Sequence, residues 1–358
     1  MNEKRVQVVG EPPVLNRPPA QEETDSDNEC EIVEPRLEES DLHETEKAQD
    51  EDEEGMEELM SAFEDNETEL DLTHLRIKSM KRLNLPRFAN TLERLNLRQN
   101  EIRQMRGKDL SSVPHLKELD LYDNAIEHIS GLDGNEELEI LDLSFNNIRH
   151  VSRITHLGRC HTLYLVQNKI ATVRPTDFTG PISMSLRSLE LGGNRLRSLE
   201  NLSQLSNLEE LWVGKNKITS LESNRLTKLE GLETLEALEE LYLSHNGIQK
   251  LEGLGKNVNL TTLDFAANQV SVIENVGHLK KLSQFWVRMQ HSHQANDNHI
   301  DDINHLDAQL GPQNMPELET VYLEGNPAQK TEGSSYRRKV QLALPQIQQL
   351  DATYVRRN

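Results

Sequence analysis

The stretch LKELDLYDNAI, from Leu116 to Ile126, has leucine at its first, fourth and sixth positions and asparagine at its ninth. The same arrangement returns as LEILDLSFNNI from Leu138 and as LEELYLSHNGI from Leu238. Copies of the pattern L-x-x-L-x-L-x-x-N-x-(I/L/V), some with another apolar residue at a leucine position, occur ten times between Leu92 and Asn326, most often at a step of 22 residues. A fixed period of this length is typical of solenoids built from stacked copies of one small unit.

The pattern also indicates how each unit folds. The two leucines of L-x-L alternate with an outward residue, as in a short strand, and neighbouring units would place such strands in parallel about 4.8 Å apart. The ninth-position asparagine would lie at the following turn and bond backbone groups that are otherwise buried without partners. The sequence therefore predicts an α/β leucine-rich-repeat solenoid. Its curved parallel sheet would form the concave face, and short helices or turns would form the convex face.

Composition divides the chain into three parts. Residues 1–64 form an acidic leader, since residues 21–60 carry 19 Asp and Glu against only two basic residues, and we expect this leader to be disordered apart from a short helix around Met56–Phe63. Residues 65–330 hold about 11 repeats, the first with Leu75 where asparagine is expected. Residues 331–358 form a C-terminal cap. The side chains expected to cover the open end of the core are Tyr336, Val340, Leu342, Leu344 and Ile347.

Two irregularities interrupt the period. Near residues 217–232 one repeat is truncated, because Asn224 follows Asn216 after only 8 residues. Near residues 288–295 an insertion separates a strand from its NDNHI sequence. We expect both events to disturb the solenoid locally.

Charge and residue usage exclude several classes of function. The formal net charge of -22 argues against nucleic acid or an anionic membrane as the main ligand. The two cysteines, Cys30 and Cys160, favour an intracellular protein over an extracellular one with cysteine-rich caps. His291, His293, His299 and His305 lack a fixed ligand frame, so no metal site is predicted. No cofactor motif and no nucleophile with an adjacent base occur, and the chain is not expected to be an enzyme.

The candidate binding residues occupy the outward position between the two strand leucines. The predicted site consists of Asp120, Asp142, Tyr164, Glu190, Trp212, Tyr242, Asp264, Trp286 and Tyr322, preceded by Asn96 in the same position. Exposed Trp and Tyr commonly carry the binding energy of protein interfaces. Asp120 and Asp142 would stand roughly 5 Å apart and repel by about 0.8 kcal/mol in water, an arrangement that favours a basic partner. The alternative is that an open sheet face simply needs polar residues.

The repeats and the cap resemble those of the leucine-rich-repeat regulatory subunit of protein phosphatase 1. The resemblance rests most on YLSHNGI (Tyr242–Ile248), on TVYLEGNP (Thr320–Pro327) and on the cap YRRKVQLALPQIQQLDATYV (Tyr336–Val355). It covers about residues 65–358, and at Tyr164 and Trp212 the family favours phenylalanine.

The resemblance implies a non-catalytic protein of nucleus and cytoplasm, active in mitosis, that binds the phosphatase catalytic subunit through its concave face and regulates its activity or assembly. It leaves room for a further phosphatase-1 regulator in a ternary complex. The alternative is a leucine-rich-repeat scaffold or adaptor of the ciliary or centrosomal type. Such scaffolds usually carry coiled coils, and no sustained heptads occur here.

Overall fold

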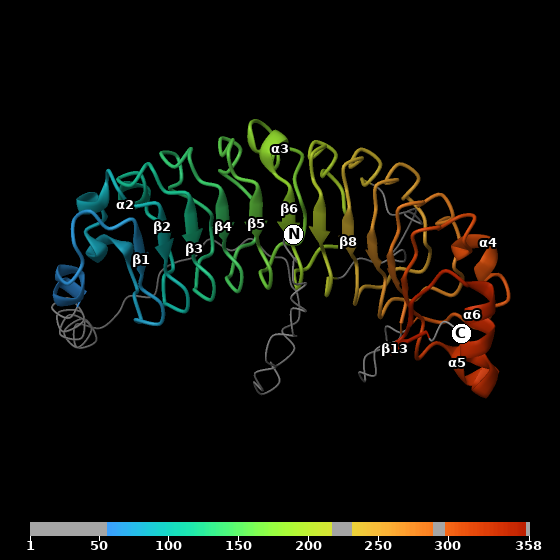
Figure 1. Cartoon of the computed structure of the whole chain (residues 1–358). Coiled ribbons are helices and arrows are strands. Elements are labelled where there is room, and N and C mark those ends of the chain that lie inside the picture. The colour runs from blue at the N-terminus through green and yellow to red at the C-terminus, as the bar shows by residue number, and fades with distance from the viewer. Residues whose placement is uncertain (1–55, 217–230, 289–297, 356–358) are drawn as a thin grey trace, which may run out of the picture. The chain divides into compact units, whose positions relative to one another are not determined.

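The computed structural model describes residues 56–216, 231–288 and 298–355. In this part of the chain the strands follow one another in chain order through a single sheet (Figure 1). The repeat strands pair in parallel and are three residues long: β1 (Glu69–Asp71), β2 (Arg94–Asn96), β3 (Glu118–Asp120), β4 (Ile140–Asp142), β5 (Thr162–Tyr164), β6 (Ser188–Glu190), β7 (Glu210–Trp212), β8 (Glu240–Tyr242), β9 (Thr262–Asp264), β10 (Gln284–Trp286) and β11 (Thr320–Tyr322). The predicted leucine-rich-repeat solenoid is confirmed.

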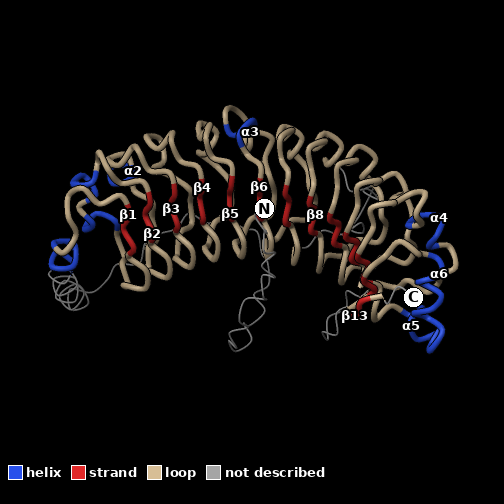
Figure 2. Tube along the Cα trace, in the orientation of Figure 1, coloured by secondary structure: helices blue, strands red, loops and turns tan. Residues whose placement is uncertain are grey.

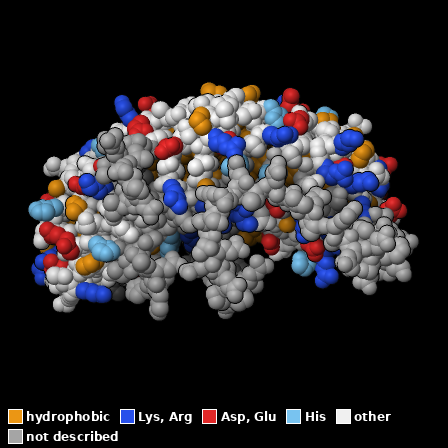
Figure 3. All heavy atoms as spheres, turned by 180° about the vertical axis from the view of Figure 1, so that it is seen from behind, with side chains coloured by type: hydrophobic (Ala, Val, Ile, Leu, Met, Phe, Trp, Pro, Cys, Tyr) orange, Lys and Arg blue, Asp and Glu red, His pale blue; other side chains and the backbone are white. Residues whose placement is uncertain are grey.

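Loops and turns make up most of the rest of each repeat, and the helices are short (Figure 2). In the described residues they are a helix at residues 56–61, α2 (Gly107–Leu110), α3 (Ile182–Ser185), α4 (Leu306–Leu310), α5 (Pro327–Glu332), α6 (Tyr336–Ala343) and the 3-10 turns η1 (Met80–Leu83), η2 (Leu85–Phe88) and η3 (Gly333–Ser335). None of the described helices is long and apolar enough to cross a membrane. Seen from behind, acidic and basic side chains are interspersed over the molecule (Figure 3).

The repeated leucines form one continuous core. In the third repeat strand, Leu119 and the following Leu121 are fully buried, whereas Glu118 and Asp120 between and beside them remain partly exposed. The same alternation recurs in every repeat strand except β9, and the buried side chains join into one cluster from Met60 to Leu350. Stacking is therefore required for stability, because a single unit cannot bury its own apolar side chains.

A ladder of buried asparagine amides links the units. Asn146 Nδ2 donates to the carbonyl oxygens of Leu121 (2.9 Å) and Leu143 (3.1 Å), and Asn146 Oδ1 accepts the backbone N–H of Ile126 (2.9 Å). Each amide thereby pairs backbone groups of its own repeat and of the one before it. The same two-carbonyl pattern is made by Asn100, Asn124, Asn168, Asn194, Asn216, Asn246, Asn268, Asn298 and Asn326. Their predicted architectural role is confirmed.

The sheet continues across both irregularities. Strand β7 pairs directly with β8, with Leu211 opposite Leu241, and β10 pairs with β11, with Phe285 opposite Val321. Most of the truncated repeat and of the insertion lies outside the described residues, at 217–230 and 289–297. The expected disturbance therefore does not reach the strands, and Asn298 still donates to the carbonyl oxygens of Phe265 and Val287 although the insertion separates it from β10.

At the N-terminal end, residues 56–61 form the expected short helix, and its Met60 is buried against the first repeat. The ordered structure thus already includes residues 56–64, which the sequence assigned to the leader; residues 1–55 of that leader lie outside the described part. In the first repeat, Leu75 is exposed and donates its N–H to Asn100 Oδ1 at 3.0 Å.

At the C-terminal end, α6 is followed by β12 (Gln349–Leu350), parallel to β11, and by β13 (Thr353–Tyr354), antiparallel to β12. Tyr336, Val340 and Leu344 are buried as expected, and so is Ile347. Leu342 is instead 72% exposed, so its predicted place in the core was wrong. Tyr336, Val340 and Leu344 are four residues apart and share the buried face of the helix. Leu342, two residues after Val340, points to the opposite side.

Candidate functional site

The structure brings the nine predicted site residues together in one row. Each is the last residue of its strand, and the parallel register sets each of them opposite its neighbour, as in Asp142 opposite Tyr164 and Glu190 opposite Trp212. With Asn96, which ends β2 in the same position, these nine residues form what we call the strand row: Asn96, Asp120, Asp142, Tyr164, Glu190, Trp212, Tyr242, Asp264, Trp286 and Tyr322. The spacing of the row is that of neighbouring strands in a sheet.

The carboxylates in the row have a structural role that the sequence did not suggest. Oδ1 of Asp120, of Asp142 and of Asp264 accepts the backbone N–H two residues further on, at 3.0, 2.8 and 2.7 Å. The next residue then has a positive φ, as at Asp123 and Phe145. A short Asp or Asn side chain can satisfy a backbone donor at such a turn. Part of this acidic character therefore serves the turn at the end of each strand.

Arg98 compensates two of these charges. Its Nη1 lies 2.9 Å from Asp120 Oδ2 and 3.8 Å from Asp142 Oδ2, and its guanidinium stacks 4.1 Å from the centre of the Tyr122 ring. The repulsion between Asp120 and Asp142 is therefore compensated within the fold, and their spacing alone does not require a basic partner. Arg98 stands two residues after Asn96, hence on the same side of the sheet, and this alternation could have revealed it.

Glu190 remains an uncompensated acid in the middle of the row. Burial raises its pKa to about 7, and the nearby carboxylates of Asp142 and Glu210 add to the shift. No ion pair to Glu190 occurs among the described residues. Glu190 also contributes, after burial, to a raised pKa of the neighbouring Tyr164 hydroxyl. A cation placed here would relieve the repulsion among three carboxylates.

Aromatic rings form a continuous strip over the later strands. The rings of Trp212 and Tyr242 stack with centres 3.6 Å apart at 18°. Tyr242 meets Trp286 edge to face at 6.2 Å, and Trp286 meets Tyr322 in the same manner at 6.0 Å. Each such pair contributes about 0.5–1.5 kcal/mol beyond its buried area. Trp212 is 38% exposed, and the other three rings are half-buried, so Trp212 is the ring of the strip that is most open to solvent.

Polar contacts hold two of the four rings of the strip, Tyr242 and Tyr322. The Tyr242 hydroxyl donates to Glu240 Oε2 at 2.7 Å, and Gln349 Nε2 from the cap donates to the Tyr322 hydroxyl oxygen at 2.7 Å. The Arg288 guanidinium lies 5.5 Å from the centre of the Tyr322 ring. The rings are therefore fixed before any partner arrives, which lowers the entropy cost of binding.

Asp264 differs from the expectation for the row. It is only 7% exposed, because Tyr242 and Trp286, on the strands to either side, reach across it. Burial raises the pKa of Asp264 to about 6, against the lowering effect of its hydrogen bonds from Ala266 and Ser244. Asp264 therefore lies beneath the strip and is almost fully covered by it.

The indole N–H of Trp286 destabilises the fold. Its indole Nε1 is buried without a hydrogen-bond partner in the part of the chain that the structure describes. A buried donor without an acceptor costs about 1–3 kcal/mol, and phenylalanine at this position would avoid that cost. Stability alone therefore does not explain a tryptophan here.

Sequence reasoning missed two aromatic residues beside the row. Tyr122 and Phe145 follow β3 and β4, and their ring centres lie 4.8 Å apart. Phe145 is 41% exposed and has a φ of 57°. The signal was present in the sequence: Phe145 occupies a turn position that Gln99, Asp123, Gln167 and Lys215 fill in other repeats.

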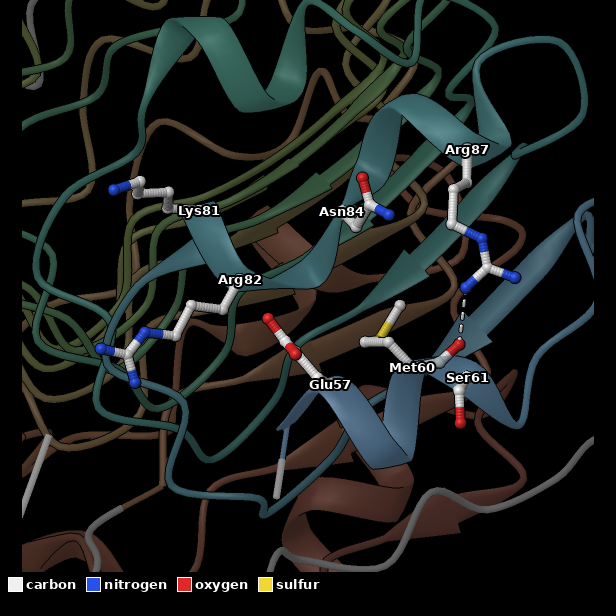
Figure 4. A pocket seen from close by; sticks show the side chains of 7 residues that line it. All are labelled: Glu57, Met60, Ser61, Lys81, Arg82, Asn84 and Arg87. Atoms are coloured by element: carbon white, nitrogen blue, oxygen red, sulfur yellow. Dashed lines mark hydrogen bonds between the residues drawn. The ribbon is translucent and has the colours of Figure 1, made fainter. Parts of the chain in front are cut away.

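A hollow of about 480 Å³ lies at the N-terminal end, away from the row (Figure 4). Glu57, Met60 and Ser61 line one side, and Lys81, Arg82, Asn84 and Arg87 line the other. Arg87 donates to the carbonyl oxygens of Met60 and Phe63 and pairs with Asp65, so it anchors the first helix to the repeats. This contact explains the order of residues 56–64.

The histidines do not form a metal site in the described residues. His299 and His305 belong to no group of three or more metal-ligating side chains, and His291 and His293 lie outside the described part. The strand row contains acceptors and aromatic rings arranged along a face, an arrangement suited to contact with another macromolecule.

Comparisons with known proteins agree with this architecture. Residues 90–148 match the family described as Leucine rich repeat, and residues 185–223 match Leucine Rich repeats (2 copies). An internalin from Listeria monocytogenes has a similar solved structure, with a TM-score of 0.57 at 22% identity over 85% of this chain and 89% of that one. At this identity the likeness concerns the fold.

Curated relatives share more of the sequence. The chain is 35% identical over 159 residues to the Protein phosphatase 1 regulatory inhibitor subunit PPP1R7 homolog of Arabidopsis thaliana, covering 43% of this chain and 46% of that protein. It is 44% identical over 103 residues to the Protein phosphatase 1 regulatory subunit SDS22 of Saccharomyces cerevisiae, covering 28% of this chain and 30% of that protein. The matches thus span less than half the length of either relative. The resemblance seen in the sequence is confirmed: the chain is a leucine-rich-repeat protein similar to the SDS22 and subunit 7 regulatory subunits of protein phosphatase 1.

Proposed function

We propose that this protein is a non-catalytic regulatory subunit that binds the catalytic subunit of protein phosphatase 1 through the strand row. The relatives are named as regulatory subunits of that phosphatase, which supports the choice of partner. The continuous strip of rings from Trp212 to Tyr322, beside the uncompensated carboxylate of Glu190, is the observation that carries the choice of surface.

The two halves of the row would act differently. Trp212 offers an exposed ring stacked on Tyr242, so it can bury a large apolar area at little cost in side-chain order. Glu190, with Asp142 and Glu210 near it, favours a lysine or arginine of the partner. Charged contacts of this kind would speed association at low salt. We expect the complex to form in the nucleus and in the cytoplasm.

A binding measurement with purified phosphatase catalytic subunit tests this proposal. Trp212→Ala should raise the Kd at least tenfold, since a ring at the centre of an interface commonly contributes more than about 1.4 kcal/mol. The matched control is Met184→Ala in α3, where an equally apolar and more exposed side chain (61%) lies outside the row. Both variants should retain the circular dichroism and melting temperature of the unchanged protein to within a few degrees.

Two results would count against the proposal. Equal affinities of the Trp212→Ala and unchanged proteins would exclude the strand row, and no binding by the unchanged protein would exclude the partner. A scaffold of the ciliary or centrosomal type is the alternative. Purification from cells distinguishes the two, because a regulatory subunit should co-elute with the phosphatase at equal stoichiometry.

A further inference from the structure

Phe145 occupies a backbone conformation that suits a different residue. Its φ of 57° lies in the left-handed region, which costs a non-glycine residue about 1–2 kcal/mol and is most easily adopted by Gly, Asn and Asp. None of the equivalent turn positions with positive φ holds a large apolar side chain; their residues are Gln99, Asp123, Gln167, Gly193, Lys215, His245, Ala267 and Gly325. A large apolar side chain is therefore not required by the turn.

The contacts of Phe145 within the chain do not explain it either. Its ring packs on Tyr122 with centres 4.8 Å apart at 45°, which contributes about 0.5–1.5 kcal/mol. That gain is of the same size as the backbone cost, and 41% of the side chain stays exposed to water. Folding alone thus leaves the choice of phenylalanine without a net benefit.

The surroundings of the pair indicate what would cover it. Tyr122 carries the Arg98 guanidinium on its ring, and Arg98 is already bound to Asp120 and Asp142. Asp123 adds a third carboxylate beside Tyr122, so one base faces three acids there. An apolar side chain flanked by a basic one would match both the rings and this charge.

The pair also borders the strand row without interruption. Tyr122 follows Asp120 by two residues, and Phe145 follows Asp142 by three. Arg98 touches both carboxylates and Tyr122, which ties the pair and the row into one surface. A protein that lay along the row would therefore reach the rings as well.

We infer that Tyr122 and Phe145 form an extension of the binding surface, which receives an apolar side chain flanked by a lysine or arginine from the protein bound along the strand row. This inference rests on the proposed function, since the same phosphatase catalytic subunit is the occupant. It adds a contact at the turn edge of β3 and β4 to those on the strands themselves.

Phe145→Asn tests the extension, because asparagine accepts the left-handed conformation and the fold should be kept or stabilised. The Kd for the catalytic subunit should rise at least fivefold, whereas Phe145→Tyr, which keeps the ring, should bind within twofold of the unchanged protein. Gln99→Asn is the matched control: Gln99 has a φ of 54° at the same turn position, is exposed and polar, and its replacement should leave the Kd unchanged.

The possible outcomes separate the two ideas. If Phe145→Asn unfolds at the same or a higher temperature and binds like the unchanged protein, the extension is refuted and the strand row is untouched. If Trp212→Ala also binds normally, the proposed surface fails as a whole. Loss of affinity in Phe145→Asn and Gln99→Asn alike would likewise refute a specific role of the ring.

Discussion

The rings of Tyr242 and Trp286 meet edge to face with centres 6.2 Å apart, although β9 runs between the strands that carry them. Both side chains must lean across the intervening strand, and Asp264 lies buried in the position they cover. The aromatic strip is thus built over an acid, and the protonation of that acid is linked to the stability of the fold.

Asp264→Asn should change how stability depends on pH. Burial raises the pKa of Asp264 from the ordinary range of an aspartate to about 6, so the folded protein holds this proton more tightly than the unfolded chain does. The protonated Asp264 side chain thereby adds about 3 kcal/mol to the free energy of unfolding. This stabilisation is fully present below pH 4 and is lost as the pH rises to about 6. Urea unfolding at pH 4 and pH 7 should show that the free energy of unfolding of the variant, relative to that of the unchanged protein, is higher at pH 7 than at pH 4. Parallel pH curves for the two proteins would contradict this.

Arg98→Met should leave Asp120 and Asp142 uncompensated. Removal of the guanidinium raises the pKa of Asp142 further, so the loss of unfolding free energy should be small at pH 4 and grow toward pH 7. Because Arg98 is 38% exposed, we expect a loss of about 1 kcal/mol at neutral pH. The double variant Arg98→Met/Asp142→Asn should recover part of it. If Arg98→Met lost the same unfolding free energy at both pH values, the loss would come from the packing of Arg98 on Tyr122 and not from its charge.

Asn146→Ala should test the asparagine ladder. The change leaves the Ile126 N–H and the carbonyl oxygens of Leu121 and Leu143 buried without this partner, at a cost of about 3–5 kcal/mol. Asn207→Ala, which removes one surface hydrogen bond to Met184 O, is the control and should cost less than about 1 kcal/mol. Hydrogen exchange should locate the added opening around β3 and β4. Similar losses in both variants would exclude a special role of the ladder.

Glu190 predicts a pH dependence of binding. In the free protein, burial and the nearby acids raise the pKa of Glu190 to about 7. A basic group of the partner would stabilise the ionised carboxylate. Binding would therefore release a proton, and affinity for the phosphatase catalytic subunit should increase about tenfold from pH 6 to pH 8. Calorimetry in two buffers of different ionisation enthalpy measures the proton directly. Glu190→Gln should remove this dependence, and its persistence in the variant would point to another group.

The period of the sequence was sufficient to predict the fold and the alignment of the site. Strand and asparagine positions recur at fixed distances, and stacking then forces equivalent residues into register, as with Asp142 opposite Tyr164. The prediction failed where the outcome depends on neighbouring repeats. The burial of Asp264 requires two rings from other strands, and the Arg98 contact with Asp142 crosses from β2 to β4. Leu342 was a different error, since helical spacing alone would have placed it outside the core.

The direct pairing of β7 with β8 across a stretch of irregular length has a mechanical consequence. Backbone hydrogen bonds and the buried asparagine amides set the distance between neighbouring strands. This distance therefore stays the same when the segments that connect the strands differ in length. Peptides could be spliced into these segments as tags or sensors, and the side chains of the strand row would keep their positions relative to one another.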